Sequence, residues 1–80
     1  MTIEETIAWN KVDDYAQRTH GYSVVGMEPN GYTGYTIKLN RLGASAQHRQ
    51  ITIFPDVFRS IITSDALPQT VKQNIDEAVQ

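Results

Sequence analysis

The chain has 80 residues, a hydrophobic fraction of 40%, a charged fraction of 20% and a formal net charge of -2. These values are typical of one small folded domain, and they exclude a disordered chain and a strongly basic DNA-binding domain. The absence of cysteine excludes disulfides, thiolate zinc sites and cysteine nucleophiles. We expect a soluble cytoplasmic protein, because the first 20 residues contain four acids and no uninterrupted apolar run that would indicate a signal peptide or a membrane span.

The N-terminal segment predicts an amphipathic helix that ends near residue 19. Thr2 and Glu5 form the Ser/Thr-x-x-Glu capping box of a helix start, and Gly21 is suited to the helix end. Ile3 and Ile7 fall outside the main apolar face; we expect them to cover another part of the core, and the alternative is that they are exposed. The main apolar face consists of Ala8, Val12, Tyr15, Ala16 and Thr19, with Trp9 at its edge.

Two segments with alternating polarity, joined by Pro29-Asn30-Gly31, predict an antiparallel hairpin. Proline presets the turn dihedral and Asn-Gly tolerates positive φ, so residues 22–28 should pair with residues 32–40. Alternation in the second strand divides its side chains between two faces. One face carries Tyr35, Ile37 and Leu39, and the other carries Thr36, Lys38 and Asn40.

The second half of the chain predicts a third strand and two helices. Residues 41–47 read as a loop, and residues 48–54 read as a strand with Ile51 and Ile53 facing inward. Pro55 suits the first turn of a short helix, and Pro68 precedes the last one. The fold class is therefore α+β: a single two-layer domain of order α-β-β-β-α-α, with the helices on one face of a three-stranded antiparallel sheet. The apolar stripes of the two helices are Val57, Phe58, Ile61 and Ile62, and Leu67, Val71, Ile75, Ala78 and Val79.

The residue types that carry chemistry do not form a catalytic or metal-binding pattern. His20 stands at the end of the first helix, where its ring can cap free carbonyls, and His48 has the position of a surface residue. Neighbouring carboxylates on a helix point about 100° apart, which prevents them from sharing a proton or a metal ion. No serine or glycine spacing matches a nucleophile elbow or a phosphate loop. We expect no catalytic residue, no metal ligand and no cofactor, and hence a protein that is not an enzyme.

The outward side chains of the sheet form the candidate recognition surface. No Asp or Glu occurs between Pro29 and Pro55. Tyrosine, asparagine and a few cations suit recognition, because they combine stiff contact area with adaptable hydrogen bonds. By alternation, Val25 or Met27 would add a small apolar centre. An ordinary solvated face is the alternative to a binding role. The predicted binding residues are Tyr32, Thr36, Lys38, Asn40, Arg41, His48, Arg49 and Gln50.

Two functions are compatible with this surface. In the first, the domain binds another protein stoichiometrically, as small intracellular inhibitors, immunity proteins and phage-encoded antagonists of host defences do. In the second, tyrosines stack on the bases of single-stranded nucleic acid or RNA while Lys38, Arg41 and Arg49 contact phosphates. The chain is expected to be a monomer, or a homodimer formed through an unpaired edge strand or through Ile3 and Ile7.

Overall fold

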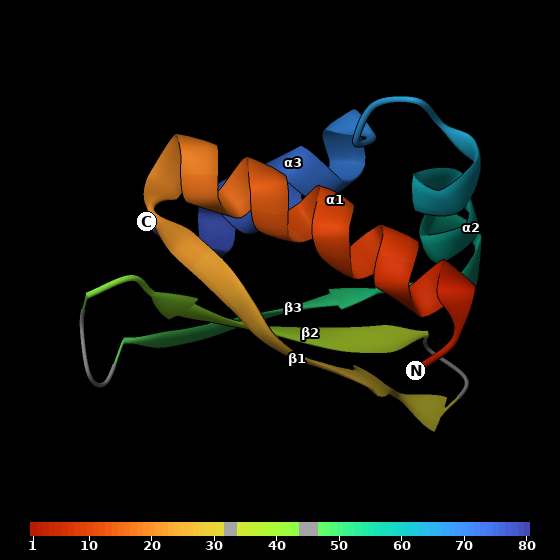
Figure 1. Ribbon diagram of the computed structural model, residues 1–80, viewed down its shortest axis with the longest axis horizontal. Coiled ribbons are helices and arrows are strands. Elements are labelled where there is room, and N and C mark those ends of the chain that lie inside the picture. Colours follow the sequence, from red (N-terminus) through yellow and green to blue (C-terminus); the bar gives the residue numbers. More distant parts are fainter. Residues whose placement is uncertain (32–33, 44–46) are drawn as a thin grey trace.

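The computed structural model describes residues 1–31, 34–43 and 47–80, and it confirms the predicted fold class. Three antiparallel strands form one sheet in the order β1-β2-β3. The helices all lie on the same side of this sheet, which leaves the other side bare of helices (Figure 1). The elements are α1 (Ile3–His20), β1 (Tyr22–Pro29), β2 (Tyr35–Arg41), β3 (His48–Ile53), α2 (Pro55–Thr63) and α3 (Gln69–Ala78).

Helix α1 begins and ends where the sequence predicts. The capping box at its start is present: the Glu5 N–H donates to Thr2 Oγ1 at 3.1 Å, and the Thr2 N–H donates to Glu5 Oε1 at 2.8 Å. At its end Gly21 adopts a left-handed φ of 72° and donates its N–H to the carbonyls of Ala16 and Gln17. This turn redirects the chain into β1, which lies across the same helix.

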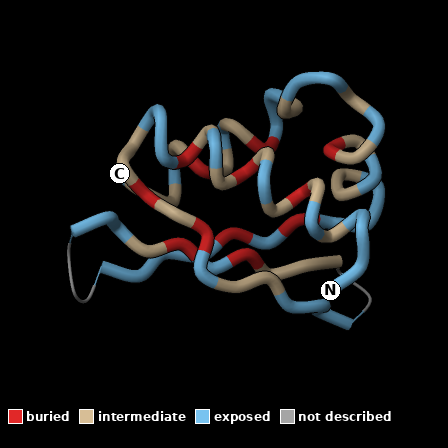
Figure 2. The backbone as a smooth tube through the Cα atoms, in the orientation of Figure 1, coloured by how far each residue is buried: buried red, intermediate tan, exposed pale blue. Residues whose placement is uncertain are grey.

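The core lies between the two layers, where the buried segments of the helices face those of the sheet (Figure 2). Because each fully buried Val, Leu or Ile side chain contributes about 1.5–3 kcal/mol, this single apolar layer is the main source of stability. The predicted inward faces are confirmed. Ala8, Val12 and Ala16 of α1, Ile37, Leu39, Ile51 and Ile53 of the sheet, and Ile61, Val71 and Ile75 of α2 and α3 are all buried.

The expectation that Ile3 packs against the core is wrong. Ile3 is 81% exposed, and Ile7, one turn later, is only half-buried. Thr19 is also exposed, at the other end of the helix. Both ends of α1 extend beyond the apolar layer, so the stripe that packs runs only from Ala8 to Ala16.

A β-bulge in β1 changes which of its side chains face the helices. Val24 pairs with Leu39 and Met27 pairs with Ile37, while the register shifts between Val24 and Gly26. The extra residue, Val25, is 54% exposed, whereas Met27 packs against the core. Simple alternation predicted one face for both residues, and the inserted position is the reason why it fails for Met27.

Strand β2 begins three residues later than predicted. Pro29 pairs with Tyr35, where the strand starts, and the predicted start, Tyr32, lies outside the described residues. Just before the strand, Gly34 has a φ of 101°, and a Cβ at this position would collide with the Ile53 carbonyl oxygen. The hairpin end therefore packs directly on the chain between β3 and α2, and only glycine fits this contact.

Candidate functional site

Five of the predicted binding residues share the side of the sheet that faces away from the helices, which we call the open face. Directly opposite residues of an antiparallel pair point to the same side. The pairs Thr36↔Thr52, Lys38↔Gln50 and Asn40↔His48 alternate with pairs of buried residues, which places them on the open face. Together with Val25, Gly26 and Glu28 of β1, they make a surface that spans all three strands.

The remaining three predicted residues are placed differently. Arg49 pairs with Leu39, so its position in the register belongs to the helix-covered side. Its side chain is exposed and donates to the His48 carbonyl at the sheet edge, so Arg49 still borders the open face. Arg41 pairs with the buried Tyr22 and is likewise exposed; its Nη1 donates to Gln47 Oε1 at 3.4 Å. Tyr32 lies outside the described residues, so its predicted place on the open face stays a prediction.

A depression of about 660 Å³ lies in the open face, and we call it the Val25 hollow. Val25 is the extra residue of the bulge and its side chain is exposed, while the Lys38 side chain lies over neighbouring Gly26. The walls come from β2 and β3. The residues that line the Val25 hollow are Val25, Lys38, His48, Arg49 and Gln50.

The charges of the open face are paired, which the sequence did not indicate. The Lys38 ammonium lies 3.2 Å from Glu28 Oε1, and its aliphatic stem runs across Gly26. A solvent-exposed ion pair of this kind contributes about 0–1 kcal/mol, so it can rearrange when a partner binds. Glu28 is the last acid before the acid-free stretch. Glu28 lies beside Lys38 because of the register in which β1 and β2 pair. The sequence does not define this register, so the ion pair was not predicted.

The described tyrosines are engaged on the helix side of the molecule. Tyr22 is buried beneath the helices, and Tyr35 stacks on Phe58 of α2 with ring centroids 4.4 Å apart. Burial, followed by a hydrogen bond with Glu5, raises the pKa of Tyr35. Among the strand residues that the structure describes, none on the open face is Phe, Tyr or Trp.

A second polar cluster joins α1 to α3. Tyr15 donates its hydroxyl to Asp76 Oδ1 at 2.8 Å, and His20 Nε2 lies 2.6 Å from the same oxygen. The hydrogen bond with His20, then that with Tyr15, lowers the pKa of Asp76, while burial and then Asp76 raise the pKa of Tyr15. The sequence suggested that the His20 ring caps the carbonyls at the end of its own helix. Instead, the Gly21 N–H bonds to these carbonyls, and the His20 ring reaches across to α3. No local sequence signal links residues 56 positions apart.

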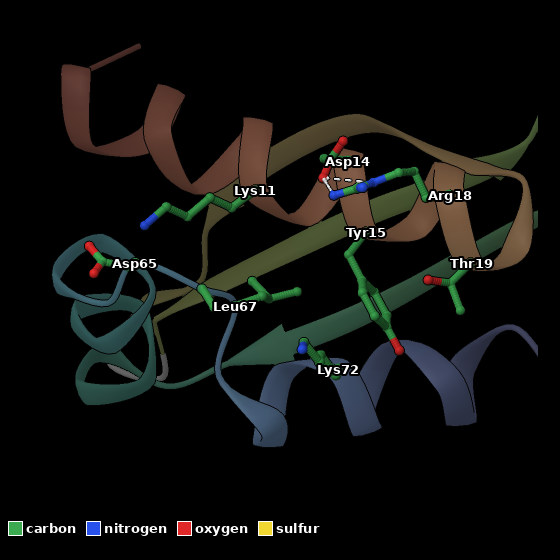
Figure 3. A pocket seen from close by; sticks show the side chains of 9 residues that line it. Lys11, Asp14, Tyr15, Arg18, Thr19, Asp65, Leu67 and Lys72 are labelled. Carbon is green, nitrogen blue, oxygen red and sulfur yellow. Dashed lines mark hydrogen bonds and ion pairs between the residues drawn. The ribbon is translucent and has the colours of Figure 1, made fainter.

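Next to this cluster, a groove of about 450 Å³ lies between α1, the connection from α2 to α3, and α3 (Figure 3). Its three cations already have protein partners. Lys11 donates to the carbonyls of Ile61 and Ser64, Arg18 forms an ion pair with Asp14 at 2.7 Å, and the Lys72 ammonium lies 5.8 Å from the centroid of the Tyr15 ring. The Lys11 and Lys72 contacts join α1 to α2 and α3, and the Arg18 ion pair lies within α1, so the groove has a structural role.

The described residues contain neither a cluster of metal-binding side chains nor a helix that could span a membrane. Within residues 1–31, 34–43 and 47–80, no group of three or more His, Asp or Glu is placed to hold a metal ion. In the same ranges, no helix has the length and apolar character needed to cross a bilayer.

Comparisons of the chain with models of protein families, with curated proteins and with solved structures gave no match. The open face is therefore the feature from which a function can be inferred.

Proposed function

We propose that the protein is a non-catalytic module that binds another protein stoichiometrically through its open face, as an inhibitor or antagonist of a larger protein or complex does. The observation that carries this proposal is the Val25 hollow. It combines an exposed apolar side chain with polar and charged neighbours, on a sheet face that the described helices leave uncovered. Protein interfaces are built in this way, with a small apolar centre inside a polar rim.

Two observations favour a protein over single-stranded nucleic acid as the ligand. Nucleic-acid binding on a sheet requires aromatic side chains for the bases and free cations for the phosphates. The described strand residues of the open face include no Phe, Tyr or Trp. Lys38 is already paired with Glu28, and the pairing register assigns Arg41 and Arg49 to the other side of the sheet. A protein partner carries both acidic and basic side chains, so it can bind either Lys38 or Glu28 when their ion pair opens.

The proposal is tested by capture of a partner with a tagged protein from the native host, with identification by mass spectrometry. Val25→Lys introduces a charge into the centre of the hollow. Leu42→Lys is the matched control, because Leu42 is also 54% exposed but lies outside the hollow. We expect Val25→Lys to weaken binding of the captured protein at least about tenfold, or about 1.4 kcal/mol, and Leu42→Lys to leave it unchanged.

Nuclease treatment separates the two ligand classes in the same experiment. A protein partner remains bound after the treatment, whereas material held through nucleic acid is released. Equal capture by wild-type protein and Val25→Lys would contradict the open face as the binding surface. Binding of single-stranded probes at low salt, with an affinity that falls steeply as salt is raised, would instead support the nucleic-acid alternative.

A further inference from the structure

The two edges of the sheet differ in their capacity to accept another strand. On the β1 edge, the Val24 N–H points outward and is already bonded to Asp13 Oδ1 at 2.9 Å. The bulge at Val25 follows, and Pro29 has no N–H to offer. Prolines, bulges and side chains that cap outward groups are the devices by which proteins protect a sheet edge. The β1 edge is closed in all three ways.

The β3 edge carries a regular row of outward backbone groups. The Arg41 N–H donates to the Gln47 carbonyl at 3.2 Å, so these two residues form a hydrogen-bonded pair at the end of the ladder. Hydrogen-bonded and non-hydrogen-bonded pairs alternate along antiparallel strands. It follows that Arg49, Ile51 and Ile53 direct their backbone groups toward β2. His48, Gln50 and Thr52 direct theirs away from the sheet.

These outward groups are largely unoccupied. The His48 carbonyl accepts a hydrogen bond from Arg49 Nη1 at 2.9 Å. For Gln50 and Thr52, the described part of the chain provides no bond to the outward N–H or carbonyl. Strand β3 also has no proline and no bulge among its described pairs. An extended chain laid along this edge would find both backbone groups of Gln50 and Thr52 at regular spacing.

The charged residues at the β3 edge favour binding of an acidic segment. His48 and Arg49 lie on β3, and the sequence holds no acid from residue 30 to residue 54. A second copy of this chain would bring another His48 and Arg49 to the same edge, and the added positive charge disfavours pairing of β3 with itself. A segment with Asp or Glu side chains would place a carboxylate beside the Arg49 guanidinium, with which it can form two parallel hydrogen bonds.

We propose that the β3 edge receives an extended, acidic segment of the partner protein as a fourth strand. Its backbone pairs with Gln50 and Thr52, and one of its carboxylates binds Arg49. This inference rests on the proposed function and adds the mode of recognition to it, which is strand addition to an exposed sheet edge. Arg49 and Gln50 also line the Val25 hollow, so the added strand and the hollow form one continuous contact surface.

The test uses a peptide of defined chemistry. Acetyl-(Glu-Val)₃-amide is titrated into the protein while the backbone amide resonances are followed by NMR, and acetyl-(Lys-Val)₃-amide is the control of opposite charge. We expect the acidic peptide to shift the amides of Gln50 and Thr52 and to bind at least about tenfold more tightly than the basic peptide. Shifts confined to other elements, equal affinity of the two peptides, or no shift at millimolar concentration would overturn the proposal.

Variants at the edge sharpen the test. Thr52→Pro removes an outward N–H without removing a bond to β2, and Thr52→Val keeps this N–H. Arg49→Glu reverses the charge, with Arg59→Glu on α2 as its exposed control. We expect Thr52→Pro and Arg49→Glu to weaken binding of the acidic peptide at least about tenfold, and the two controls to retain it. Should Thr52→Pro unfold, the Arg49 pair and the amide shifts of the wild-type protein still decide the question.

The host partner distinguishes failure of this inference from failure of the proposed function. Loss of capture by both Val25→Lys and Thr52→Pro supports both. Loss by Val25→Lys alone leaves the proposed function standing and overturns strand addition. Capture that neither variant changes contradicts both. Concentration-dependent dimerisation of the free protein, with protection of the Gln50 and Thr52 amides from hydrogen exchange, would make a second copy the occupant and overturn the inference as stated.

Discussion

Lys11 stabilises a helix other than its own. Its ammonium donates to the Ile61 carbonyl at 2.8 Å and also to the Ser64 carbonyl, at the C-terminal end of α2. That helix has no basic residue in its last turn, and cations near a helix C-terminus interact favourably with its unbonded carbonyls. One side chain of α1 thus supplies the cap that the sequence of α2 lacks.

Replacement of Lys11 should therefore destabilise the fold. We expect Lys11→Met to lower the free energy of unfolding by about 1–3 kcal/mol, because partly buried carbonyls lose a charged donor. Arg18→Met is the control: it removes an exposed ion pair on the same helix and should cost at most about 0.5 kcal/mol. Urea denaturation followed by the fluorescence of the single tryptophan, Trp9, measures both changes. Equal effects would show that Lys11 is not a cap.

Gly34 provides a second prediction at this scale. An alanine Cβ there would collide with the Ile53 backbone, and φ is also positive. We expect Gly34→Ala to cost about 3 kcal/mol, from backbone strain and overpacking together. At Gly21, φ is 72° and no heavy atom lies within 4 Å of the added Cβ, so Gly21→Ala should cost only about 1 kcal/mol. The difference between the two denaturation midpoints checks the close approach, and similar midpoints would argue against it.

At the scale of elements, Asp76 joins the two long helices through Tyr15 and His20. Its pKa in the folded protein is lowered from 3.8, first by the hydrogen bond with His20 and then by that with Tyr15. A carboxylate with a lowered folded-state pKa contributes stability above its unfolded pKa. The contribution is lost as the pH falls through the folded-state value. The α1–α3 contact should accordingly weaken in acid.

This sign leads to a pH prediction for Asp76→Asn. The variant should be less stable than wild type at neutral pH, and its free energy of unfolding should fall less steeply between about pH 5 and pH 2. We expect the stability of Asp76→Asn to keep some dependence on acid because of Asp13. The pKa of Asp13, which burial alone would raise, is lowered by hydrogen bonds from Ser23, Val24 and Gln17. Glu77→Gln, next along α3 and exposed, should keep the wild-type slope. Parallel slopes for wild type and Asp76→Asn would contradict this role.

The elements themselves could be predicted because local signals mark their ends. The capping box of Thr2, the left-handed Gly21 and the proline at residue 55 give three of these boundaries. The bulge could not be predicted, since Val24 and Val25 are equally suited to a strand and either could face the core. Only the packing of β1 against α1 decides between them.

For the whole molecule, two layers leave one sheet face without helices, and the sequence predicted this arrangement from alternation in β2 and β3. The content of that face was predicted only in part. Thr36, Lys38, Asn40, His48 and Gln50 share it, but the ion pair with Glu28 depends on the pairing register. Arg41 has the same parity as Ile37 and Leu39, and Arg49 has the same parity as Ile51 and Ile53, so alternation alone could have placed both arginines on the helix-covered side.

The most direct test of the open face is hydroxyl-radical footprinting of the protein alone and bound to its captured partner, read by mass spectrometry. In the free protein, Val25 and Leu42 should both be oxidised, whereas Ile37 and Ile51 should be protected by the helices. On binding, we expect Val25 and His48 to lose reactivity while Leu42 and Ile3 retain it. Protection of Ile3 with undiminished oxidation of Val25 would contradict the account, because it would place the partner on the helix layer.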